Sequence, residues 1–143
     1  MSINSSSLRL WYARIVMVSA VLIFAFLASL YAFNPTAGID MFGVSISGEP
    51  HSITFLRTSL GAMFSGLFFA SAIGLVKPRL FMTCLTIVIS FMATIVGLRL
   101  YGLAIDGVTY TNLSELRNEG LFLLFFISGW LSHPRSGRET TPK

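Results

Sequence analysis

Four charged side chains stand inside or beside long apolar stretches of this sequence, and they are its strongest candidates for chemistry: Arg57, Arg99, Glu115 and Glu119. Ionisable groups at membrane depth are costly, so they usually face the interior of a helix bundle and mark functional sites. Glu115 and Glu119 are four residues apart, which places them on one face of a helix. Since a guanidinium binds carboxylates in a bidentate geometry, the two glutamates are predicted to meet Arg57 or Arg99.

The depths of these four residues point to one region of a membrane. At a rise of ~1.5 Å per residue, Glu119 lies about 20 Å and Glu115 about 26 Å above the end of the last apolar stretch. Arg57 and Arg99 come out at about 29–30 Å, near the far boundary of a ~30 Å hydrocarbon core. The four residues are therefore predicted to line an outward-facing polar pocket, with His51 at its mouth. In this pocket the arginines would hold an anionic group and Glu119 would orient them.

A structural interpretation of the same charges stays open beside the pocket. Charges near helix ends extend to the membrane interface, and a buried ion pair can serve only to fix the register of two helices. The short side chain of Glu119 favours the pocket for that residue. A lone histidine in a loop, such as His51, is more often solvated than catalytic, and no catalytic residue is predicted.

Four apolar runs must position these charges. They cover about residues 10–33, 54–76, 80–101 and 113–132, and each is close to the ~20 residues that cross a bilayer. The sequence thus predicts an all-α fold, a four-transmembrane-helix bundle in a single membrane domain over 1–143, with tails 1–9 and 133–143. The first run could also be a signal peptide, but it is longer than the ~7–15 residues of a signal core, which favours an uncleaved helix.

Composition excludes several classes of protein. Of 143 residues, 54% are hydrophobic and only 11% are charged, against about 25% charged in soluble domains. A water-soluble globular protein, a disordered tail and a nucleic-acid-binding module are therefore excluded. The one cysteine, Cys84, permits no intrachain disulfide, and the two histidines fall at opposite ends of the predicted bundle, so neither a metal site nor a cofactor is predicted.

The distribution of basic residues predicts the orientation in the membrane. An even number of spans places both tails and the loop between the second and third spans on one side. That side carries seven basic residues and the other carries three, so the positive-inside rule makes both termini cytoplasmic in a multi-pass inner (plasma) membrane protein. The seven are Arg9, Arg14, Lys77, Arg79, Arg135, Arg138 and Lys143.

Small residues predict how the second and third spans pack. Small side chains let membrane helices approach closely, and a short Lys77-Pro78-Arg79 connection makes these spans antiparallel neighbours. We therefore expect two small-residue stripes to meet, rather than to line a polar pore, for which the bundle has too few polar groups. The stripes are Ala62, Gly66, Ala70 and Gly74 on the second span, and Thr86, Ser90, Ala93 and Gly97 on the third.

Several short motifs carry a resemblance. They are Pro35 in the first loop, Arg57-Thr58-Ser59-Leu60-Gly61 at the start of the second span, Arg99-Leu100-Tyr101-Gly102-Leu103 in the third, and Asp106-Gly107 after it. With them the chain resembles small bacterial four-helix membrane proteins catalogued as a domain of unknown function, although members often have paired glycines where this chain has Leu60-Gly61. The four-helix plan is also distantly similar to DoxX-type membrane proteins, some of which are associated with quinone or thiol redox systems.

Two functions follow as expectations. The first is a non-enzymatic membrane protein that binds a small amphipathic ligand or lipid, including a quinone, in the outward-facing pocket. The second, implied by the DoxX-type likeness, is an accessory subunit of a quinone-linked membrane redox complex, although the sequence itself supplies no redox group. Partners beyond the lipid bilayer would be a second copy of the chain or a larger membrane subunit.

Overall fold

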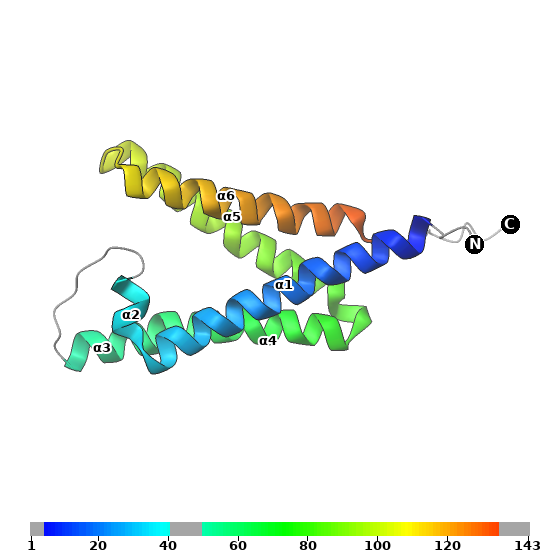
Figure 1. Cartoon of the computed structure of the whole chain (residues 1–143), viewed down its shortest axis with the longest axis horizontal. Coiled ribbons are helices and arrows are strands. Elements are labelled where there is room, and N and C mark those ends of the chain that lie inside the picture. Colours follow the sequence, from blue (N-terminus) through cyan, green and yellow to red (C-terminus); the bar gives the residue numbers. More distant parts are fainter. Residues whose placement is uncertain (1–4, 41–49, 135–143) are drawn as a thin grey trace, which may run out of the picture.

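The computed structural model describes residues 5–40 and 50–134, and every regular element in these ranges is helical (Figure 1). The all-α prediction is confirmed. Within residues 5–40 and 50–134, three segments are long and apolar enough to cross a membrane: Ser5–Phe33, Pro50–Val76 and Pro78–Ile105. The elements in chain order are α1 (Ser5–Phe33), α2 (Pro35–Asp40), α3 (Pro50–Leu56), the π-helical turn η1 (Arg57–Gly61), α4 (Ala62–Val76), the 3-10 turn η2 (Pro78–Leu80), α5 (Phe81–Ile105) and α6 (Tyr110–Ser132).

The last helix, α6, differs from the other long helices in its charge. It has 23 residues, which is about 35 Å of helix, long enough to cross a bilayer. Any stretch of 18 residues within α6 contains Glu115, Arg117 and Glu119, so it is less apolar than the three segments above. Among the described residues there are thus four long helical segments, of which three are apolar enough to be candidate membrane spans.

The long helices extend beyond the predicted spans because turn chemistry, and not hydropathy, ends them. The second is continuous from Pro50 through η1 to Val76, and Pro50 suits a first helical position, where no N–H is needed. Gly107 takes a positive φ of 97° after α5, and the Thr109 side chain accepts a hydrogen bond from the Asn112 backbone N–H at the start of α6. Residues 1–4 and 135–143 of the predicted tails lie outside the described residues.

The helices form two pairs that meet at one end of the molecule. Figure 1 shows α1 running along α4, and α5 running along α6. The start of α1 is joined to the end of α6 by a hydrogen bond of 2.7 Å between the hydroxyls of Tyr12 and Ser128. The turn η2 lies at this same end, which we call the Lys77 end (Figure 1). The opposite end, where α6 begins, is called the Tyr110 end.

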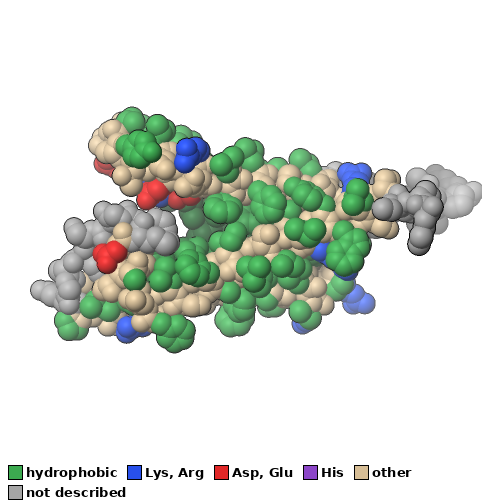
Figure 2. Space-filling model, in the orientation of Figure 1, with side chains coloured by type: hydrophobic (Ala, Val, Ile, Leu, Met, Phe, Trp, Pro, Cys, Tyr) green, Lys and Arg blue, Asp and Glu red, His purple; other side chains and the backbone are tan. Residues whose placement is uncertain are grey.

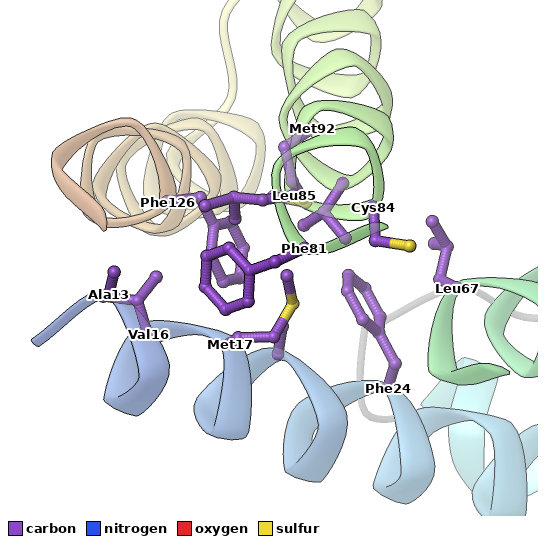
Figure 3. Packing of buried hydrophobic residues seen from close by; sticks show 12 residues of the cluster. Ala13, Val16, Met17, Phe24, Leu67, Phe81, Cys84, Leu85, Met92 and Phe126 are labelled. Atoms are coloured by element: carbon purple, nitrogen blue, oxygen red, sulfur yellow. The ribbon is translucent and has the colours of Figure 1, made fainter. Parts of the chain in front are cut away.

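The larger of two hydrophobic core clusters occupies the Lys77 half of the described structure, and a smaller one joins Tyr31, Ile39 and Leu56 where α1, α2 and α3 meet. Figure 3 shows Met17 and Phe24 of α1 pointing toward the buried side chains of α5, with Phe126 of α6 beside them. On α5 the buried residues stop at Met92, and on α6 they begin only at Phe126. The two helix pairs are therefore packed together near the Lys77 end and separate toward the Tyr110 end.

The predicted seam between the two small-residue stripes is formed only at Gly74. A Cβ built on Gly74 would lie 2.8 Å from the Cys84 Cβ, whereas no atom lies within 4 Å of such a Cβ on Gly66 or Gly97. Ala62, Thr86, Ser90 and Ala93 are exposed and Ala70 is half-buried. The prediction was wrong over most of its length because α4 and α5 turn larger side chains inward, among them Leu67, Leu85 and Val88, which fill the space between the pairs.

Candidate functional site

Arg99 and two glutamates form an ion cluster between α5 and α6. The Nε and Nη2 atoms of Arg99 donate to the two carboxylate oxygens of Glu119 at 2.5 and 2.7 Å, and Nη1 donates to Glu115 Oε2. All three guanidinium nitrogens are thus used, with a bidentate contact to Glu119. The three side chains are only 19–25% exposed, so they are shielded from most of their surroundings.

The α5–α6 hairpin accounts for this register. Arg99 lies six residues before the end of α5, and Glu115 and Glu119 lie five and nine residues after the start of α6. At ~1.5 Å per residue, Arg99 sits about 9 Å below the turn, between Glu115 at about 7.5 Å and Glu119 at about 13.5 Å. The short connection, with Gly107 at positive φ, therefore brings one cation between two anions on adjacent helices.

Arg57 lies apart from this cluster. Its Nε donates a hydrogen bond of 2.8 Å to the backbone oxygen of Ala32 in the last turn of α1. A basic side chain there pairs a carbonyl that the helix leaves without a partner and complements the negative end of the helix dipole. Gly61, at the other end of η1, faces the same turn of α1, since a Cβ built on it would be in van der Waals contact with the Ala32 backbone nitrogen at 3.4 Å. The Arg57–Gly61 motif thus fastens α4 to the end of α1.

Arg57→Gln should lower stability without affecting the ion cluster. We expect a loss of about 1 kcal/mol, because the substitution removes one charge-assisted hydrogen bond at an exposed position. Equilibrium unfolding by sodium dodecyl sulfate in mixed micelles measures this loss. If the variant instead unfolds as the wild type does and loses a bound ligand, Arg57 belongs to the ligand site and the structural assignment is wrong.

His51 is the remaining predicted site residue, and it lies on α3, where its side chain is exposed. The hydrogen bonds of Arg99, Glu115 and Glu119 join these three side chains to one another and do not include His51. The structure thus gathers Arg99, Glu115 and Glu119 and leaves Arg57 and His51 on the other helix pair. The sequence left open whether the glutamates pair with Arg57 or with Arg99, and in the structure both pair with Arg99.

A cleft opens where the helix pairs separate. Its volume is about 580 Å³, and its polar end is made by Glu115, Asn118 and Glu119. In Figure 2 acidic side chains edge a recess between the two lobes of the molecule, and the visible side chains beyond them are hydrophobic. The rest of the wall comes from all four long helices: Leu22, Ile23, Phe24, Phe26, Leu27, Phe64, Phe91, Met92, Ile95, Phe122 and Phe126.

One face of α6 lines this cleft, and the sequence-based prediction did not group its glutamates with its phenylalanines. Glu115, Glu119, Phe122 and Phe126 follow the 4-3-4 spacing of a single helix face, with carboxylates toward the Tyr110 end and rings below them. The rings of Phe122 and Phe126 are stacked, with centroids 6.5 Å apart. This spacing is the signal that links the charges to an aromatic wall.

Comparisons with known proteins add no family to this description. The chain matches no family model, no curated protein and no solved structure. Fold and site together define a helical membrane protein with an apolar cleft that ends at an arginine–glutamate cluster.

Proposed function

We propose that this protein is a non-enzymatic, four-span membrane protein that binds one amphipathic molecule from the bilayer in the cleft between its helix pairs. The observation that carries the proposal is the composition of the cleft, an apolar wall closed at one end by two carboxylates. Binding sites for small molecules are commonly concavities of about 300–1,000 Å³ with apolar walls and a few polar groups. The apolar part of the ligand would lie along the phenylalanines and its polar group would reach Glu115 and Glu119.

The position of the cleft favours entry from the lipid. Leu22 and Phe26 of α1 and Phe122 of α6 line the cleft and are 65%, 59% and 43% exposed. In a bilayer these side chains would meet acyl chains and not water. A molecule dissolved in the membrane could therefore enter sideways, between α1 and α6, without crossing a polar layer.

The proposed topology has both termini in the cytoplasm. Arg9, Arg14, Lys77 and Arg79 belong to the Lys77 half of the structure, which supports a cytoplasmic Lys77 end by the positive-inside rule. The cleft would then open in the outer half of the membrane. As the fourth span, α6 would carry its glutamates at lower cost because Arg99 neutralises part of their charge.

Ile95→Trp tests this function by filling the cleft. Ile95 lines the cavity, and Leu98 of the same helix is 66% exposed and lies outside it, so Leu98→Trp is a matched control. Native mass spectrometry of protein released gently from its own membrane should show one retained amphiphile on the wild type and on Leu98→Trp. The Ile95→Trp protein should be detected without a bound amphiphile, because the indole ring fills the part of the cleft that the ligand would occupy.

Two outcomes would contradict the proposal. Bare chains in all three samples would mean that the cleft holds no ligand. A second polypeptide retained equally by all three, with no small molecule, would favour the accessory-subunit alternative.

A further inference from the structure

The charge balance of the cleft restricts what its polar end can bind. Arg99 carries one positive charge, whereas Glu115 and Glu119 carry two negative charges, so the cluster has a formal charge of −1. The guanidinium already donates to both carboxylates from all three of its nitrogens. An anion entering the cleft would therefore meet carboxylates before it met a free guanidinium face.

The carboxylates at the polar end of the cleft have hydrogen-bond acceptor positions that Arg99 does not occupy. A carboxylate has about four lone-pair positions. Glu115 accepts from Arg99 through Oε2, and among the described residues its Oε1 has no protein donor. Both glutamates line the cavity, together with the Asn118 side chain. The site thus offers acceptors and negative charge to whatever occupies the cleft.

The aromatic residues that line the cleft also favour a cation, through cation–π interactions. Phe122 and Phe126 continue the stripe of Glu115 and Glu119 toward the Lys77 end, and Phe24, Phe26, Phe64 and Phe91 line the same cavity from α1, α4 and α5. The face of an aromatic ring carries negative charge density and attracts cations, most strongly where water is excluded. Carboxylates and ring faces together complement an apolar cation.

We propose that the cleft selects amphipathic cations, such as hydrophobic amines, quaternary ammonium or phosphonium compounds, whose charge lies at Glu115 and Glu119 and whose apolar body lies against the phenylalanines. This inference rests on the proposed ligand-binding function and names the class of ligand. It replaces the expectation that the arginines hold an anionic group. A quinone fits less well, because its carbonyl oxygens are acceptors that would face two carboxylates, and the Asn118 amide is the one neutral donor among the described polar residues of the cleft.

Two ions of the same shape and opposite charge test the selection. Tetraphenylphosphonium and tetraphenylborate present the same four phenyl rings and differ in the sign of their charge. Titration calorimetry of the full-length protein in maltoside micelles, with protein-free micelles subtracted, should give saturable binding of one tetraphenylphosphonium per chain. Tetraphenylborate should bind at least about tenfold more weakly, because the net negative charge of the cluster attracts the cation and repels the anion.

Variants assign the selection to named residues. Glu119→Gln removes one negative charge and should weaken tetraphenylphosphonium binding about tenfold or more. Glu115→Gln provides the same test should Glu119→Gln fail to fold. Asp106→Asn is the charge-matched control, since Asp106 is exposed and does not line the cavity, and it should bind as the wild type does. Phe122→Leu keeps the charge and removes a ring, so it should weaken binding about threefold.

The outcomes separate this inference from the function on which it rests. Saturable binding of both ions with equal affinity, or tighter binding of tetraphenylborate, would overturn the cation selection while the cleft remained a ligand site. If neither ion bound saturably, the cation selection would be overturned, whereas the ligand-binding function would still stand or fall on the amphiphile retained in native mass spectrometry. An equal loss of tetraphenylphosphonium affinity in Asp106→Asn and Glu119→Gln would also overturn the selection, because it would assign the effect to net charge alone.

Discussion

Arg99→Met is expected to destabilise the protein by about 2–3 kcal/mol. Removing one partner of a shielded ion pair leaves the other charge without compensation, which costs about 3–5 kcal/mol when the pair is fully buried. The cluster here is 19–25% exposed, so we expect somewhat less. Two carboxylates one helical turn apart would also repel each other on the same face of α6. Unfolding by sodium dodecyl sulfate in mixed micelles, with helicity followed by circular dichroism, measures the change.

Two further variants show whether the loss arises from unpaired charge. Arg117→Met removes an exposed arginine from the same helix and should change stability by less than about 0.5 kcal/mol. Combining Arg99→Met with Glu115→Gln and Glu119→Gln removes the unpaired carboxylates and should restore most of the lost stability. If Arg99→Met were as stable as Arg117→Met, the cluster would contribute nothing to the α5–α6 hairpin.

Gly129→Ala is expected to loosen the contact between α6 and α1. A Cβ at this position would lie 2.7 Å from Val16 Cγ1 and 2.8 Å from Val16 Cβ, and Val16 is fully buried. Val16 has a branched, short side chain and cannot move aside, so the helices must separate. Overpacking of this kind costs about 1–3 kcal/mol.

Gly120→Ala is the matched control for this effect. It makes the same change in the same helix, but no atom lies within 4 Å of the added Cβ. Because alanine favours a helix over glycine by up to about 1 kcal/mol, this variant should be slightly more stable than the wild type. The two variants should thus shift the unfolding midpoint in opposite directions. Equal shifts would show that α1 and α6 are not in the close contact described here.

The ion cluster was largely predictable from the sequence, because depth and helical spacing depend only on position along the chain. Counting 1.5 Å per residue placed Arg99, Glu115 and Glu119 in one half of the bundle, and the i, i+4 spacing placed both glutamates on one face. Which arginine they meet depends on tertiary structure. The short hairpin at Gly107 holds α5 beside α6, whereas η1 directs Arg57 to the end of α1.

The helix packing and the cleft could not be predicted from the sequence, because they too depend on tertiary structure. The α4 and α5 helices are apolar on most sides, so the small-residue stripes competed with faces carrying Leu67, Leu85 and Val88, and the larger side chains became the core. The cleft exists because the two pairs separate beyond Met92 and before Phe126. Separation of helix pairs leaves no periodicity in the sequence, and the aromatic residues of its wall resemble ordinary lipid-facing ones.

The central claim, that the cleft is a ligand site open to lipid, is tested most directly by an experimental structure of the protein in lipid nanodiscs. The account predicts that α5 and α6 remain separated from α1 and α4 toward the Tyr110 end. It also predicts density for an amphipathic molecule between Phe26, Phe122 and Glu119. A structure in which the two helix pairs close on each other, with no space beside Glu119, would contradict it.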